Sequence, residues 1–216
     1  MERAVFDEAA LQTDVDAKIT AALERLAVAM HKSLWEAAYA EDLTATQAQF
    51  LTYLASMGNT AVSMSDLAHR FGLSLATVSE AVRALVTKGL LEQRRSANDG
   101  RVREVRLTMQ GRRRVKALLH WADAIRDQVA ALAPQAKGLL LDSLLELIAR
   151  LQQAGLISLT RQCQTCLYFQ PHRHTDPTAP HHCGLMNQPL PLTELRIHCP
   201  DHQTRPPAPS PSAPSP

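Results

Sequence analysis

Apolar residues recur every three or four positions over most of the first 155 residues, and this spacing predicts a chain built mainly of helices. The long helical patterns cover residues 14–40, 43–58, 109–132 and 134–153. Glycine is common just after a last helical turn and proline at a first one, so Gly58, Pro134 and Gly155 are expected to mark helix ends. The predicted fold class is therefore mainly α.

The middle of the chain contains two shorter helical patterns. Ser65 is expected to cap a helix at 66–71, and Gly72 to make the turn after it. Ser74 is expected to cap a second helix, which ends at Lys88–Gly89. Its apolar residues fall on one side, so the opposite side is free to enter the major groove of DNA. The apolar side holds Val78, Val82 and Leu85, and the free side holds Ala76, Thr77, Ser79, Glu80 and Arg83.

Two strand patterns follow the second of these helices. Residues 90–95 and 102–108 are expected to form a hairpin around a turn at 97–100. Two short helices joined by a glycine-bearing turn, then a basic hairpin, then another helix, are the elements of a winged helix-turn-helix. This order of elements is far more specific than a helical hairpin alone.

Positive charge is concentrated in the same region. Residues 94–116 contain nine basic and two acidic side chains, a net charge of +7, while the whole chain carries only +2 and the remainder therefore −5. Most charge runs are solvated helix faces. Beside a helix-turn-helix, however, a dense basic block favours a surface that meets phosphate groups.

These motifs together resemble the MarR family of bacterial regulators. The resemblance covers roughly residues 14–155. The matching stretches are Leu43–Gln47, Leu67–Ala68, Ser74–Ser79, Lys88–Leu91, Arg94–Arg95, Asn98–Arg101, and Leu107–Thr108 with Gly111. The resemblance implies an obligate homodimer with long dimerisation helices at both ends of this region and one winged helix per subunit. It also implies binding to a palindromic operator, usually as a repressor.

The resemblance also carries over site residues. Ser74, Thr77, Ser79 and Arg83 match positions that contact bases or phosphates, and Arg101 matches the wing arginine that enters the minor groove. Asp99 is expected to brace the wing. Glu80 departs from the family pattern, and we expect it to face solvent or form an ion pair. The predicted DNA-binding set is Ser74, Thr77, Ser79, Arg83, Arg94, Arg95, Arg101 and Arg103.

A small-molecule effector is a further implication of the resemblance. Family members often bind aromatic or phenolic effectors between the winged helix and the dimerisation helices. His31, Trp35, Tyr39 and His120 are candidates to line such a pocket, although aromatic residues at helical spacing more often belong to a core.

All four cysteines of the chain lie in its last quarter, as Cys163-x2-Cys166-x16-Cys183-x15-Cys199. Six of the nine histidines and all but one of the thirteen prolines also lie beyond residue 170. Clustered cysteines in a protein of a reducing compartment favour metal binding over disulfides. The predicted domains are a winged-helix and dimerisation domain at 1–160, a small metal-stabilised Cys/His module at 161–205, and a disordered proline-rich tail at 206–216.

The ligand of the module stays open between two cofactors. Four thiolates suit a tetrahedral zinc or an iron–sulfur cluster, and we favour the cluster. His182, beside Cys183, is an alternative ligand, but each of the four histidines near the cysteines is expected to be a surface residue: His181, His182, His198 and His202. The hypothesis is a regulator under metal- or iron–sulfur-dependent control. The alternative is a regulator of an aromatic effector, whose cysteine module is a structural zinc site or docks a partner.

Other classes of protein fit less well. The sequence has no phosphate-binding loop, nucleophile elbow or HExxH motif, and its Cys-x2-Cys pair lacks the βαβ setting of a thiol oxidoreductase. We therefore expect no enzyme. There is no run of eighteen apolar residues and no visible signal peptide, which predicts a cytoplasmic protein without a membrane partner.

Overall fold

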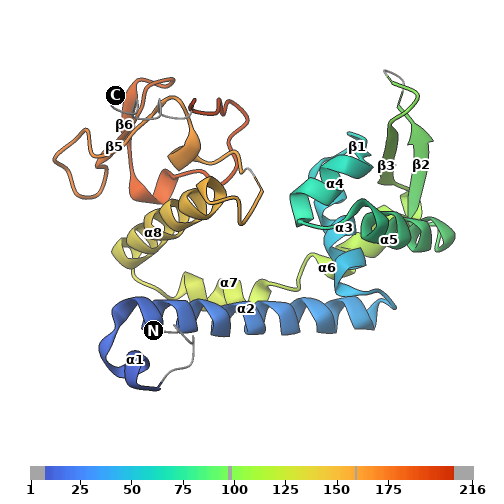
Figure 1. Ribbon diagram of the computed structural model, residues 1–216, viewed down its shortest axis with the longest axis horizontal. Coiled ribbons are helices and arrows are strands. Elements are labelled where there is room, and N and C mark those ends of the chain that lie inside the picture. The colour runs from blue at the N-terminus through green and yellow to red at the C-terminus, as the bar shows by residue number, and fades with distance from the viewer. Residues whose placement is uncertain (1–7, 97–98, 159, 207–216) are drawn as a thin grey trace, which may run out of the picture. The chain divides into compact units, whose positions relative to one another are not determined.

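The structure, a computed structural model, describes residues 8–96, 99–158 and 160–206 (Figure 1). It divides into two compact units, and the boundary lies between Gln128 and Val129. Within the described ranges, no helix is long and apolar enough to cross a membrane. The predicted disordered tail lies outside these ranges except for Pro206, and so do residues 97 and 98 of the predicted turn.

The first unit contains the winged helix and the predicted long helices other than the one at 134–153. Its helices are α1 (Glu8–Thr13), α2 (Val15–Ala40), α3 (Ala45–Ser56), α4 (Met64–Phe71), α5 (Leu75–Thr87) and α6 (Met109–Leu118), with α7 (Asp123–Ala130) at the boundary. Its strands are β1 (Val62–Ser63), β2 (Leu91–Arg95) and β3 (Arg103–Leu107). The helical spacing of apolar residues therefore predicted most of these elements.

Side-chain caps fix where several helices begin. Thr44 and Gln47 form a reciprocal capping box at the start of α3, which satisfies two main-chain N–H groups that the first helical turn leaves unpaired. The prediction that Ser65 caps α4 was wrong. The Ser63 hydroxyl accepts the main-chain N–H of Asp66 at 3.0 Å, so α4 begins at Met64. Gly72 ends α4 at a positive φ of 62°, as expected for a glycine stop.

The winged helix is a three-stranded antiparallel sheet packed on helices. The strand order is β1-β3-β2, with Leu91 opposite Leu107 and Arg95 opposite Arg103. β1 has only two residues and was not predicted, because so short a strand shows no alternation. Figure 1 shows α5 beside the hairpin of β2 and β3. The buried core beneath them includes Phe50, Leu51, Leu54, Leu67, Val78, Val82, Leu85, Leu90, Val105 and Leu118.

The single helix predicted at 109–132 is wrong, because the structure has two helices there, α6 and α7. The chain leaves the helical path at residues 119–122. At this point the hydroxyl of Ser33 on α2 donates to the main-chain carbonyl of Trp121, and the His120 ring bonds the Asp123 carboxylate at 2.7 Å. The Trp121 carbonyl at the break therefore has its partner on another helix, and the His120 ring has its partner three residues further along the chain.

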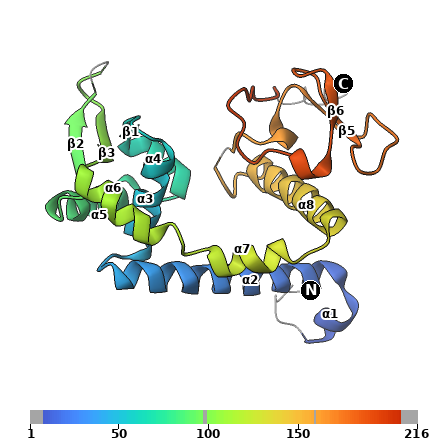
Figure 2. The same ribbon diagram turned by 180° about the vertical axis from the view of Figure 1, so that it is seen from behind.

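The second unit combines α8 (Pro134–Gln153) with the cysteine segment. The segment contains the short helices η1 (Cys163–Thr165) and η2 (Leu192–Glu194) and an antiparallel sheet of β4 (Phe169–Gln170), β5 (His181–Cys183) and β6 (Gln188–Leu190). Figures 1 and 2 both show this segment against one side of α8. The observed division differs from the boundary predicted at 160/161, because Leu141 and Leu145 of α8 pack in the core of the segment.

Candidate nucleic-acid interface and metal centre

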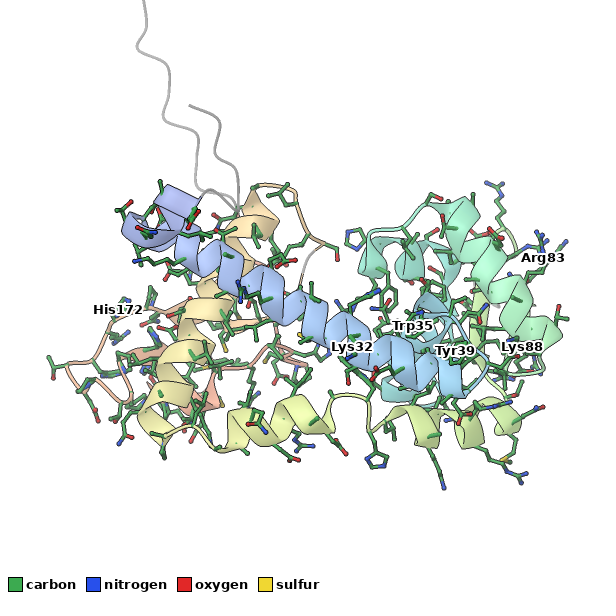
Figure 3. All side chains as sticks on the ribbon, turned by 90° about the horizontal axis from the view of Figure 1, so that it is seen from below. Lys32, Trp35, Tyr39, Arg83, Lys88 and His172 are labelled. Atoms are coloured by element: carbon green, nitrogen blue, oxygen red, sulfur yellow. The ribbon has the colours of Figure 1, made fainter. Side chains whose placement is uncertain are left out.

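A groove of about 610 Å³ runs between α5 and the hairpin of β2 and β3 in the first unit. Four of the predicted DNA-binding residues line it: Ser79 and Arg83 from α5, and Arg101 and Arg103 from the wing. All four side chains are exposed, and Figure 3 shows Arg83 on the outer side of α5. The fold therefore gathers basic and hydroxyl groups from two separate segments along one surface.

The inner side of α5 explains why its outer side is polar. Val78, Val82 and Leu85 are buried in the core, and their helical spacing turns Ser79, Glu80 and Arg83 toward solvent. This is the arrangement in which the second helix of a helix-turn-helix presents side chains to base edges.

Ser74 and Thr77 lie at the N-terminus of α5 and outside the groove lining. The Ser74 hydroxyl accepts the main-chain N–H of Thr77 at 3.1 Å and lies 2.9 Å from the Thr77 hydroxyl. Ser74 therefore caps the helix, as predicted. Its hydroxyl already has partners in the protein, so its structural role is established independently of any contact with DNA.

We expect S74A and S79A to separate these two roles. S74A removes the cap and should lower the free energy of unfolding by about 1 kcal/mol. S79A changes an exposed helical position to a better helix former and should leave stability unchanged or slightly higher, while it weakens binding to DNA. Urea unfolding of both variants checks the first part and a DNA-binding titration the second. Equal stability of S74A and the unmodified protein would contradict the capping role.

The tip and sides of the wing have defined contacts. The Asp99 carboxylate accepts the main-chain N–H of Arg101 at 2.9 Å, and the Asp99 carbonyl accepts that of Val102 at 2.9 Å. This geometry fits the bracing role predicted for Asp99. Arg95 and Arg103 face each other across the strands, and both are exposed.

Arg94 differs from the other predicted wing residues, because its guanidinium donates to the Glu92 carboxylate at 3.0 Å. Glu92 also accepts from Arg106, and this hydrogen bond with the nearby positive charges lowers the pKa of the Glu92 carboxyl. Arg94 therefore keeps a partner within the protein and does not line the groove.

Two ion pairs that the sequence did not reveal tie the end of α2 to the winged helix. Lys88, at the end of α5, donates to the Asp42 carboxylate at 2.9 Å and to its carbonyl, and this lowers the pKa of Asp42. Arg114 of α6 pairs with Glu41 at 2.9 Å. The partners are 46 and 73 residues apart, so local spacing held no signal for them.

The expected effector pocket is only partly formed by this chain. Trp35 and Tyr39 stack on α2 with ring centroids 5.3 Å apart (Figure 3). His31 and Trp35 line an open depression of about 540 Å³, all of whose lining residues belong to α2. Tyr39 and His120 lie outside it, and one helix alone does not enclose a ligand.

The four cysteines meet at one small pocket in the second unit. Cys163, Cys166, Cys183 and Cys199 all line a space of about 40 Å³, together with Tyr168, Phe169, Leu185, Met186, Leu190, Arg196 and Asp201. All four are free thiols rather than disulfides. Backbone pairing positions two of them. Cys183 lies opposite Phe169 in the pairing of β5 with β4, and Cys166 forms an isolated antiparallel β-bridge with Thr204.

The charge environment of the pocket is set by Arg196, which sequence reasoning did not single out. Its main-chain N–H donates to Cys163 Sγ at 3.2 Å, and its guanidinium to Cys199 Sγ at 3.6 Å. Burial raises the pKa of the Cys163 thiol, and the neighbouring cysteines raise it further, while the N–H donor opposes them. A thiol in this setting favours its protonated form when no cation is bound.

The histidines of the segment serve other contacts and do not line the cysteine pocket. His181 and His182 are both buried, contrary to their expected surface places. The Nε2 of His181 lies 3.3 Å from the Asp142 carboxylate on α8. Burial lowers the pKa of His181. His182 bonds His174 at 3.1 Å, and His202 bonds Thr165 at 3.0 Å. In the described parts of the chain, no group of three or more His, Cys, Asp or Glu side chains is arranged to hold a single ion.

Comparison with solved structures identifies the fold of the first unit. MepR of S. aureus in its DNA-binding conformation is 22% identical, with 62% of this chain and 98% of that chain covered at a TM-score of 0.57. The S. aureus MepR–DNA complex is 21% identical, with 61% and 96% covered at a TM-score of 0.55. The chain therefore has the winged helix-turn-helix fold of these proteins.

Sequence comparison shows which proteins this winged helix is similar to. Residues 41–102 match the sequence model of the MarR family. The "Uncharacterized HTH-type transcriptional regulator YdgJ" of Bacillus subtilis (strain 168) is 31% identical over 84 residues, which are 38% of this chain and 51% of that protein. The chain thus spans about half the length of this curated relative. Residues 41–102 therefore resemble the MarR family, and the matched relative is named as a transcriptional regulator.

Proposed function

We propose that the protein is a homodimeric, cytoplasmic DNA-binding transcriptional regulator that represses from a palindromic operator. The observation that carries this proposal is the groove between α5 and the wing, where Ser79, Arg83, Arg101 and Arg103 converge. Side chains on a recognition helix read base edges, and arginines that meet phosphates or the minor groove add affinity. The MarR-family match of residues 41–102 and the S. aureus MepR–DNA complex support the same function.

A second copy of the chain is the partner that this function requires. Two recognition helices must lie about 34 Å apart to enter successive major grooves on one face of DNA. Large apolar side chains remain exposed along α2 and at the start of α8, a pattern that a dimer interface would cover. They include Ile19, Leu26, Met30, Trp35 and Tyr39 on α2, and Leu139 and Leu140 on α8.

The ion pairs at the end of α2 support control of this geometry. Lys88–Asp42 and Arg114–Glu41 connect α2 with α5 and α6. A change in how two α2 helices pack would therefore shift the recognition helices and alter DNA affinity. We propose that a cofactor on Cys163, Cys166, Cys183 and Cys199 supplies such control. An aromatic effector bound beside α2, with the cysteine site structural, is the alternative.

Selection from a random DNA library tests the DNA-binding function, and we expect the enriched sequence to be a palindrome with half-sites one helical turn apart. Affinity for it should fall steeply with salt, because log K falls by about 0.9 per decade of salt for each phosphate contacted. R95A and R103A should each reduce this slope by about one. Titrations at several salt concentrations measure it. A library without any enriched sequence would contradict the proposal.

A further inference from the structure

We propose that the four-cysteine pocket holds an iron–sulfur cluster rather than a single zinc ion, and that the cluster keeps the segment folded on α8. All residues from which we infer the cluster lie in the second unit. Its effect on DNA rests on the proposed function.

The arrangement of the sulfurs argues against one ion. A tetrahedral zinc requires four ligands about 2.0–2.3 Å from a common point. No group of three or more metal-binding side chains in the described ranges has that arrangement, yet all four thiols line one pocket. The four cysteines thus line one shared space, although they do not form a site for a single ion in this structure.

The size of the space points to a group of several atoms. The pocket measures about 40 Å³ and is lined by all four cysteines. A space of this kind between four thiols suits iron and inorganic sulfide atoms that cysteines hold from outside. Tyr168, Phe169, Leu185 and Leu190 give this space a largely apolar wall.

Arg196 supplies the donors that such a cluster needs. Four thiolates around iron leave negative charge on the sulfurs, and hydrogen bonds to these sulfurs stabilise it. Arg196 donates to Cys163 through its main chain and to Cys199 through its guanidinium. We therefore infer that Arg196 is a positioning residue, which tunes the cluster without ligating it.

The buried apolar core of the segment is small. Its strands have two or three residues each, and its buried cluster consists of Cys166, Phe169, Leu190, Leu192 and Leu195 with Leu145 of α8. So small a module usually requires a metal or disulfides for stability. Ligation at four points along residues 163–199 would supply that stability, as metal binding does in other small domains. Loss of the cluster would then uncover Leu145 and release α8.

Anaerobic purification of the full chain tests the cofactor. We expect visible absorption, with iron and acid-labile sulfide in equal amounts, about two or about four of each per chain. C183S should lose most of both. H198Q is the matched control, since His198 is exposed beside Cys199 and should leave both unchanged. One zinc per chain without sulfide, or no metal at all, would overturn the assignment.

Hydrogen exchange and DNA titration test the consequence. After an iron chelator and ferricyanide remove the cluster from the unmodified protein, amides of residues 181–190 and 141–149 should exchange faster. Affinity for the selected operator should then change at least about fivefold. Unchanged exchange, or unchanged affinity, would refute the coupling. A protein that binds no operator in either state would refute the proposed function, while the metal and exchange results would still decide the cluster.

Discussion

The double variant R83A/R101A is expected to bind the selected operator at least about 30-fold more weakly than the unmodified protein. Each good arginine contact with a base or groove contributes about 1–3 kcal/mol, and the two residues come from separate elements, α5 and the wing. Both side chains are exposed, so their truncation should leave the fold intact. Fluorescence anisotropy at one fixed salt concentration measures the loss, and circular dichroism checks the fold.

Net charge needs its own control, because any loss of two positive charges weakens DNA binding. R150A/R173A removes the same charge from exposed residues of the second unit, neither of which lines the groove. We expect this pair to lower affinity by less than about threefold, as screening limits the reach of surface charge to about 10 Å at 0.1 M salt. If both double variants lost affinity equally, the groove would have no special role.

The sequence predicted well which side of α5 is buried and which faces solvent, because a single helix carries its own periodicity. Val78, Val82 and Leu85 defined the inner side of α5, and this determined that Ser79 and Arg83 face outward. The break between α6 and α7 could not be predicted in this way. It involves Ser33 and Trp121, which are 88 residues apart in the sequence.

The same limit applies within the sites. Arg94 matched the family pattern of basic wing residues, but pairing with Glu92 depends on how two strand residues orient their side chains. The cysteine spacing predicted that four thiols serve one ligand. They do line one pocket, and the ligand stays a prediction. Arg196 was missed, since its contact with Cys163 spans 33 residues and involves a main-chain N–H that any residue type would provide.

Gly111 is the position in the winged helix where an added methyl group should cause the largest loss of stability. A Cβ there would lie 2.1 Å from the Leu90 carbonyl oxygen and 3.1 Å from the Leu107 side chain. Backbone cannot move aside as a flexible side chain can, and this oxygen already accepts the main-chain N–H of Thr108. We expect G111A to lower the free energy of unfolding by about 3 kcal/mol, the upper part of the range for overpacked sites. Urea denaturation measures this.

The control for G111A is another glycine of the same region. G100A places a methyl group in open space at a position without a positive φ, and it should change stability by less than about 0.5 kcal/mol. Because the close approach at Gly111 joins α6 to the start of β2, its loss should also displace the wing from α5 and weaken operator binding. G111A protein as stable as G100A would show that α6 does not need to approach β2 so closely. The groove would then depend on α5 and the hairpin alone.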